Sequence, residues 1–131
     1  METIKVLIVD DEEDFRDTIV KRLNSRNIPA LAAPGGKEAL AVLEDMDIDV
    51  VVLDVKMPGM DGIETLKRIK AAGFDVEVII LTGHAAVDTG IQGMQLGAFD
   101  YIMKPASMTE FLDKIRQAYI TKTERKAGSV R

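Results

Sequence analysis

The sequence contains no cysteine, no tryptophan and a single histidine among its 131 residues. Without cysteine the chain has no disulfide bonds, no thiolate nucleophile and no cysteine-based metal site. One histidine, His84, cannot build a histidine-rich metal site. Apolar runs are also short, and none approaches the roughly 20 residues that a membrane-spanning helix needs. These absences favour a protein that works away from the membrane, and we expect a cytoplasmic location.

The overall composition is that of an ordinary globular domain. A chain of 131 residues with 47% hydrophobic residues can bury one proper core, and 30% charged residues favour solubility. The net charge of −5 is unfavourable for contact with a phosphate backbone. We therefore expect one domain that does not bind nucleic acid directly.

Short apolar runs alternate with amphipathic segments along the chain. Segments with helical spacing of apolar residues are predicted at 14–25, 35–43, 63–73, 86–96 and 107–119, and strands at 4–9, 29–33, 48–53, 76–81 and 99–103. Such alternation predicts an α/β fold in which helices cover both faces of a parallel sheet. We assign residues 1–120 to this domain, and 121–131 to a basic polar tail or the start of a linker.

Polar residues with chemical potential follow four of the five predicted strands. Asp10 and Asp11 follow the first strand, Asp54 the third, Thr82 the fourth and Lys104 the fifth. Ligands of open α/β sheets bind at the carboxyl ends of the strands. The sequence therefore predicts that three carboxylates, a hydroxyl and an ammonium group gather at one edge of the sheet.

This combination of groups indicates phosphoryl chemistry. Carboxylates held close together repel unless they are protonated or neutralised, and Mg²⁺ prefers oxygen ligands while leaving positions open for phosphate. Lys104 supplies a positive charge for a phosphoryl group, and Thr82 supplies a hydrogen-bond donor. An aspartate can also act as the nucleophile, and Asp54 is the best candidate because it ends the central strand.

Four motifs carry a resemblance to a known family: VDD at 9–11, LDVKMPGMDG at 53–62, LTG at 81–83 and GAFDYIMKP at 97–105. With these motifs the sequence resembles the receiver domain of two-component response regulators, over nearly its whole length. The resemblance implies a doubly wound, flavodoxin-like sheet of five parallel strands in the order 2-1-3-4-5.

The resemblance also implies roles for the residues at the strand ends. Asp54 matches the phosphoacceptor. Asp10 and Asp11 match the acidic pair that holds Mg²⁺ together with Asp54, and of the pair Asp11 is expected to bind the ion directly. Thr82 and Lys104 match the pair that grips the phosphoryl group.

Further roles follow from the same match. The backbone carbonyl of Lys56 matches a metal ligand, and Tyr101 matches an aromatic switch that moves together with the hydroxyl residue. The Lys104–Pro105 bond matches a cis peptide. Lys56 and His84 occupy two variable positions beside the phosphoryl group, where they are expected to set its rate of hydrolysis.

The implied function is a phosphorylation-dependent switch. The chain would take a phosphoryl group from a sensor histidine kinase or a phosphotransfer protein. It would catalyse this transfer and its own later dephosphorylation, without being a conventional metabolic enzyme. Phosphorylation would change the surface of the fourth helix, fifth strand and fifth helix, which would bind an output partner or a second copy in a homodimer.

Alternative functions remain open at this point. An aspartyl-phosphate phosphatase would carry a second aspartate two residues after the nucleophile, where this chain has Lys56. A flavin carrier would need a phosphate-binding loop after the first strand, where this chain has the acidic run 10–13. A further alternative is that the chain is the receiver of a longer transcription regulator. Residues 83–105 are similar to receivers attached to ATPase-type activators, which favours this alternative.

The fourth predicted helix departs from the family pattern. It carries Gly90 and Gly93, where alanine is common in the family. Each glycine destabilises a helix by about 1 kcal/mol relative to alanine. We therefore expect a locally weak helix, or glycines that allow close packing.

Overall fold

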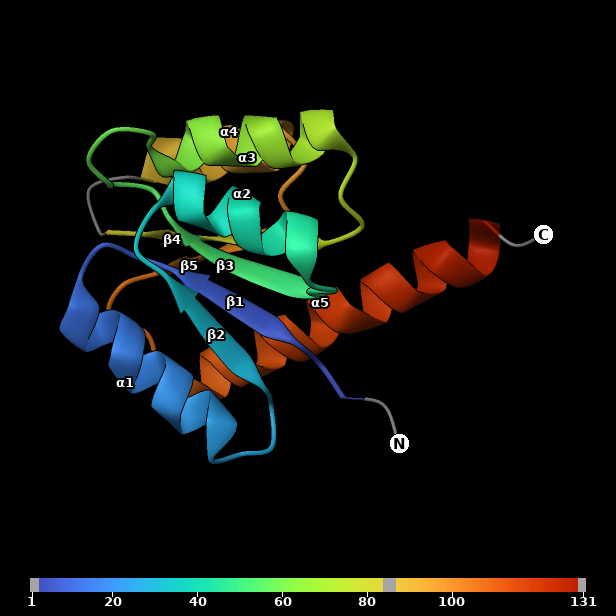
Figure 1. Cartoon of the computed structure of the whole chain (residues 1–131), viewed down its shortest axis with the longest axis horizontal. Coiled ribbons are helices and arrows are strands. Elements are labelled where there is room, and N and C mark those ends of the chain that lie inside the picture. The colour runs from blue at the N-terminus through green and yellow to red at the C-terminus, as the bar shows by residue number, and fades with distance from the viewer. Residues whose placement is uncertain (1–2, 84–86, 130–131) are drawn as a thin grey trace.

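The computed structural model describes residues 3–83 and 87–129. These residues form one parallel sheet and its covering helices (Figure 1). In chain order the elements are β1 Val6–Val9, α1 Glu13–Asn24, β2 Ala30–Ala33, α2 Gly36–Asp45, β3 Val50–Asp54, α3 Gly62–Ala72, β4 Glu77–Thr82, α4 Val87–Gln95, β5 Asp100–Met103 and α5 Met108–Ser129.

The sheet has the predicted topology. Its five strands are parallel and lie in the order β2-β1-β3-β4-β5. Val9 of β1 pairs with Ala33 on one side and Leu53 on the other, so the carboxyl ends of β1, β2 and β3 lie level. Leu81 pairs with both Asp54 and Ile102, which extends the same edge through β4 and β5. The fold class is therefore confirmed.

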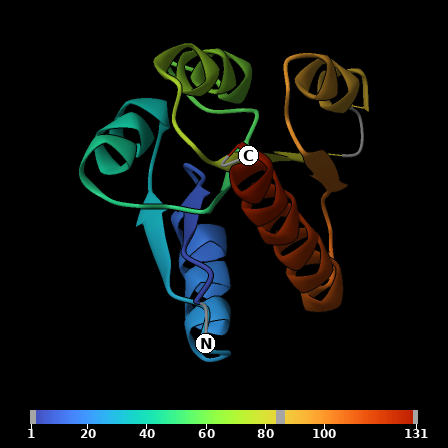
Figure 2. The ribbon, with the colours of Figure 1, turned by 90° about the vertical axis from the view of Figure 1, so that its right-hand side faces the viewer.

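Helices cover both faces of the sheet, and Figure 2 shows α2, α3 and α4 on one face with α1 and α5 on the other. The strands supply apolar side chains to both layers, because every residue of β1 and β3 is buried. Leu7 and Val51 point into the core under α2 and α3, whereas Val6 and Val50 point into the core under α1 and α5. An unbroken apolar strand is thus explained by its two covered faces.

Local capping explains where several helices begin and end. The Ser107 hydroxyl accepts a hydrogen bond from the Glu110 N–H at 3.1 Å, which is the predicted start of α5. Asp61 caps α3 by accepting from the Glu64 N–H at 2.8 Å. Gly73 ends α3 with a φ of 76°, a left-handed conformation that glycine adopts without steric cost. These residues fix the loops that lead to and from the sheet.

Helix α5 is longer than the apolar pattern predicted, because it continues to Ser129. Figure 1 shows its last turns projecting beyond the sheet. Lys122 lies 2.5 Å from Asp49, and Arg125 forms ion pairs with Asp75 and Glu77. The first turn of the expected tail therefore contacts the sheet edge opposite the candidate site.

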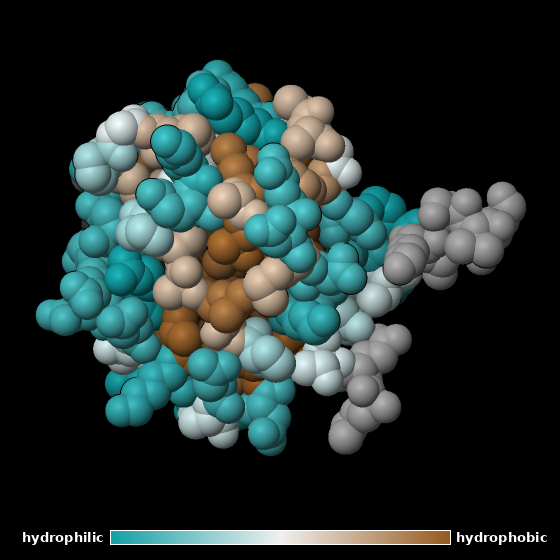
Figure 3. All heavy atoms as spheres, viewed as in Figure 1, coloured by the Kyte–Doolittle hydropathy of each residue, from teal (hydrophilic) through white to brown (hydrophobic). Residues whose placement is uncertain are grey.

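The surface view in Figure 3 shows a strip of apolar side chains surrounded by polar ones. This face includes the sheet edge formed by β2, where the Leu31 side chain is exposed. Across residues 3–83 and 87–129, no helix combines the length and apolar character required to cross a bilayer.

Candidate functional site

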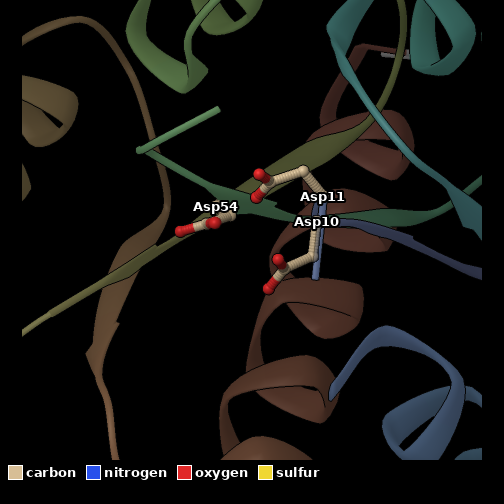
Figure 4. A group of neighbouring side chains, drawn as sticks. All are labelled: Asp10, Asp11 and Asp54. Atoms are coloured by element: carbon tan, nitrogen blue, oxygen red, sulfur yellow. The ribbon is translucent and has the colours of Figure 1, made fainter. Parts of the chain in front are cut away.

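Three aspartates form an acidic cluster at the carboxyl edge of the sheet. Asp10 and Asp11 follow β1, and Asp54 is the last residue of β3. Each offers a carboxylate oxygen, and these oxygens all lie within 4.8 Å of one another. Figure 4 shows the three side chains converging on the same space. Asp10 and Asp54 are buried, while Asp11 is exposed, so the cluster opens toward solvent on one side.

Hydrogen bonds fix the loop that carries Asp10. Its backbone N–H donates to the Ala33 carbonyl at 3.2 Å, which continues the pairing of β1 with β2. Its carboxylate accepts from the Glu12 N–H at 2.9 Å, and this bond turns the chain into α1. Arg16 donates to the Asp10 carbonyl at 3.1 Å. The position of this carboxylate is therefore set by groups on both sides of the loop.

A glycine fixes the backbone behind Asp54. The Gly62 N–H donates to the Val55 carbonyl at 2.9 Å, which brings the start of α3 against the end of β3. A Cβ atom at position 62 would lie 2.3 Å from the backbone oxygen of Asp54. No side chain fits there, so the second glycine of the LDVKMPGMDG motif has a direct structural reason.

Lys104 reaches into the acidic cluster from the end of β5. Its Nζ atom lies 3.1 Å from Asp10 and 3.9 Å from Asp54, with Glu12 at 3.7 Å. Its backbone N–H donates to the Thr82 carbonyl at 2.7 Å, and its peptide bond to Pro105 is cis. Although burial lowers the pKa of Lys104, the hydrogen bond to Asp10 and the surrounding carboxylates raise it above its ordinary value. The ammonium group is therefore charged at neutral pH.

The pKa of Asp54 is raised from 3.8 to about 7. Burial is the largest cause, the charge of Asp10 comes next, and Lys104 opposes both. Lys104 alone therefore does not offset the combined effect of burial and the neighbouring carboxylate on the pKa of Asp54. A cation bound among these oxygens would favour the ionised form of Asp54.

The donor set fits a hard divalent cation. Asp10, Asp11 and Asp54 offer only oxygen atoms, which are the ligands that Mg²⁺ prefers. The exposed position of Asp11 leaves one side open to solvent, as a partly hydrated Mg²⁺ requires.

A pocket of about 160 Å³ opens beside Asp54. Thr82, the last residue of β4, is 1% exposed and lines this pocket together with Lys104. Lys56 is exposed and lies on its wall. The pocket therefore brings a hydroxyl and an ammonium group beside the Asp54 carboxylate.

Tyr101 lies in β5, where it pairs in register with Ile80. Its side chain is partly buried and packs against the core under α2, α3 and α4. The ring of Tyr101 also lies next to Gly90 of α4, where an added Cβ would be 3.0 Å from it. Tyr101 therefore connects β5 to α4. His84, which was also expected near Thr82, lies outside the described residues.

The structure thus gathers six predicted residues at one edge, and adds three that the sequence analysis did not assign to the site. The six are Asp10, Asp11, Asp54, Lys56, Thr82 and Lys104. The additions are Glu12, Phe15 and Arg16, which contact Lys104 or Asp10. Glu12 belongs to the acidic run 10–13, which the sequence analysis weighed only against a flavin carrier, and Phe15 lies in a predicted helix whose apolar spacing carries no signal for a contact with Lys104.

The sequence matches a family model and several known proteins. A family model described as "Response regulator receiver domain" matches residues 6–116. The chain is 36% identical over 106 residues to the regulatory protein AtoC of Escherichia coli strain K12, covering 81% of this chain and 23% of AtoC. It is 33% identical over 113 residues to the response regulator MprA of Mycolicibacterium vanbaalenii, covering 86% of this chain and 49% of MprA.

A solved structure shows the same fold. The receiver domain of the Francisella response regulator 1452 superposes with a TM-score of 0.84 at 32% identity, covering 91% of this chain and 98% of that one. By contrast, the chain spans about a quarter of AtoC and about half of MprA. The similarity therefore concerns one domain rather than the whole of either relative.

Proposed function

The chain belongs to the response regulator receiver domain family, and from this premise we propose that it is a signalling switch phosphorylated on Asp54. One observation carries the proposal: Asp54 ends β3 within 4.8 Å of two further carboxylates and 3.9 Å from a charged lysine. A buried carboxylate with a raised pKa in such surroundings is typical of a functional site.

The proposed reaction is transfer from a phosphohistidine of a sensor histidine kinase or phosphotransfer protein. A carboxylate oxygen of Asp54 attacks the phosphorus, so that an O–P bond forms and the N–P bond to imidazole breaks. The imidazole nitrogen keeps the electron pair of that bond. Lys104 attracts the phosphoryl oxygens, and Thr82 donates a hydrogen bond to one of them. Hydrolysis by water later returns Asp54 to its free form.

Asp10, Asp11 and Asp54, together with the backbone carbonyl of Lys56, would hold Mg²⁺. When bound, the ion supplies positive charge that offsets the carboxylates and the phosphoryl oxygens. The chain itself positions the other groups of the site. The Glu12 N–H donates a hydrogen bond to the Asp10 carboxylate, and that carboxylate accepts another from the Lys104 ammonium.

Phosphorylation would shift an equilibrium between two surfaces of the domain. Thr82 would move toward the phosphoryl group, and Tyr101 would follow. The surface of α4, β5 and α5 would then bind an output domain, an output protein or a second copy of the chain. We place this function in the cytoplasm, without direct contact to nucleic acid or membrane.

A second arrangement is the same switch inside a longer transcription regulator. The small share of AtoC that the chain covers supports this arrangement. An aspartyl-phosphate phosphatase is disfavoured, because Lys56 occupies the position of its acid–base aspartate.

Intact-mass spectrometry tests the proposal directly. The protein is incubated with Mg²⁺ and acetyl phosphate, alongside Asp54→Asn, a matched Asp45→Asn variant and a sample containing EDTA. We expect one added phosphoryl group in the wild type and in Asp45→Asn, whose altered carboxylate is exposed on α2. Asp54→Asn and the EDTA sample should show none.

A control separates fast hydrolysis from a lack of reaction. Beryllofluoride mimics the phosphorylated aspartate without being turned over, so it should perturb the NMR signals of Thr82 and Tyr101 in a competent receiver. No adduct and no beryllofluoride response would contradict the proposed function.

A further inference from the structure

The ammonium of Lys104 contacts an aromatic ring as well as the acidic cluster. Its Nζ atom lies 4.4 Å from the centroid of the Phe15 ring, within the range of a cation–π interaction. Phe15 is in the first turn of α1, whereas Lys104 follows β5. The contact therefore depends on how the two segments fold together.

The ring of Phe15 is itself held in place by the core. Its centroid lies 6.5 Å from that of Phe111 with the ring planes tilted by 50°, a separation at which aromatic rings are in contact. Phe111 belongs to α5 and is 1% exposed, so it has little freedom to move. Phe15 thus presents a fixed aromatic surface to the lysine.

Two kinds of contact compete for the lysine. Glu12, whose side chain is 69% exposed, lies 3.7 Å from Nζ and draws the ammonium toward solvent. Asp10 and the Phe15 ring draw it inward, and the Lys104 side chain is accordingly only 22% exposed. A cation–π contact strengthens as the cation is desolvated, and the Lys104 side chain is largely shielded from water. The Phe15 ring therefore favours the inward position of the ammonium, beside Asp54.

We propose that Phe15 is a positioning residue for phosphoryl transfer, because its ring holds the Lys104 ammonium inside the site, next to Asp54. This inference rests on the function proposed above. Leucine at this position would preserve the contact with Phe111, but its side chain has no negative face to attract a cation. An aliphatic residue would therefore keep the core packed and release the lysine toward Glu12.

Four variants separate the aromatic contact from simple packing. Phe15→Leu removes the ring, and Phe15→Tyr keeps an aromatic face. Replacement of Phe15 by 3,4,5-trifluorophenylalanine keeps the shape but weakens the negative face. Phe74→Leu is the matched control, because Phe74 is also partly buried but packs on the other face of the sheet.

NMR provides a readout that does not depend on phosphorylation. A ring beside Lys104 shifts the proton signals of its ε-methylene group upfield. We expect this shift in the wild type, in Phe15→Tyr and in Phe74→Leu, and its loss in Phe15→Leu. An unchanged Lys104 signal in Phe15→Leu would overturn the contact.

The phosphorylation rate with acetyl phosphate and Mg²⁺ is the second readout. We expect the maximal rate to fall roughly three- to tenfold in Phe15→Leu and in the trifluorinated protein. Phe15→Tyr and Phe74→Leu should stay within about twofold of the wild type. Equal rates in all variants, or a slow Phe15→Tyr, would overturn the inference while leaving the proposed function intact. A wild type without any adduct would instead overturn the proposed function itself.

Discussion

The proton on Asp54 should make the stability of the metal-free protein depend on pH. Burial and then the charge of Asp10 raise its folded-state pKa to about 7, compared with 3.8 in the unfolded chain. The folded state therefore binds this proton more tightly. Its stabilising effect is complete below the unfolded value and is lost as pH rises through about 7.

We expect urea unfolding in EDTA to show this loss. Between pH 4 and pH 8 the free energy of unfolding of the wild type should fall by a few kcal/mol relative to Asp54→Asn, which cannot ionise. Above pH 7 the variant should be the more stable protein. Parallel pH profiles of the two proteins would mean that the pKa of Asp54 is not raised.

Added Mg²⁺ should reverse the destabilisation, and more strongly at high pH. The cation binds ionised carboxylates, so protons compete with it below pH 7. We expect millimolar Mg²⁺ to raise the melting temperature clearly at pH 8 and only slightly at pH 5.5. Asp11→Asn should lose this response, because it removes one of the carboxylates expected to bind the cation. The side chain of Asp11 is exposed, so the substitution leaves the core undisturbed. A full response in that variant would place the cation elsewhere.

Lys56 and His84 should determine how long the phosphorylated state lasts. Lys56 lines the pocket beside Asp54, where its side chain can exclude or orient the attacking water. His84 is expected at the same border from the sequence alone. We expect replacement of both by alanine to change the dephosphorylation rate several-fold, followed by the decay of the phosphorylated mass. An unchanged half-life would rule out this role.

At the scale of single elements, helix α4 contains two glycines that should respond differently to alanine. A Cβ on Gly93 would lie 2.8 Å from the Ile80 side chain, which is fully buried in β4. A Cβ on Gly90 would lie 3.0 Å from the Tyr101 ring, which is only partly buried and has room to shift. The local packing, rather than helix propensity, should decide the outcome at each site.

We expect Gly93→Ala to destabilise the protein by about 1–3 kcal/mol through overpacking. Gly90→Ala should stay within about 1 kcal/mol of the wild type, because the gain in helix propensity offsets the displaced ring. Urea unfolding measures both values, and NMR of the Tyr101 ring should change only in Gly90→Ala. The opposite order of stabilities would show that α4 itself moves away from the sheet.

Most of the site was predictable from the sequence because strand ends are visible in it. Asp54 and Thr82 each come immediately after a run of buried apolar residues, and the parallel arrangement brings such ends together. The strand order, in contrast, came from the resemblance to a family, since alternation alone does not determine which strands are neighbours.

Contacts between distant segments were not predictable. Phe15 lies on the apolar face of α1, and nothing in its spacing reveals a lysine from the end of β5. Similarly, Lys122 and Arg125 lie in a polar run without apolar periodicity, so the pattern ended the helix near residue 119. Their acidic partners sit at the starts of β3 and β4, which only the folded chain brings near.

At the scale of the whole molecule, helix α5 runs from the carboxyl ends of the strands to their amino ends. It begins just after Lys104 at the candidate site, and its residues Lys122 and Arg125 contact Asp49 and Glu77 at the starts of β3 and β4. Asp49 also accepts a hydrogen bond from the Lys5 N–H at 2.8 Å, so it joins the starts of β1 and β3 to α5. The part of α5 around residues 122–125 is therefore attached to the starts of the strands.

Arg125 should contribute measurably to this attachment. Its guanidinium pairs with Glu77, whose side chain is 6% exposed, and with the more exposed Asp75. Removing the arginine leaves a buried carboxylate without this partner, which is more costly than the loss of a surface ion pair. We expect Arg125→Ala to lower the free energy of unfolding by about 1–2 kcal/mol, measured with urea.

A double-mutant cycle should separate the ion pair from helix propensity. In the presence of Glu77→Gln, the effect of Arg125→Ala should shrink, because no buried charge is left unpaired. Arg116→Ala, at an exposed position of the same helix, should change stability by less than about 0.5 kcal/mol. Equal effects at Arg116 and Arg125 would mean that the end of α5 is not held by these ion pairs. A coupled pair would mean that Arg125 and Glu77 hold the C-terminal half of α5 against the starts of the strands.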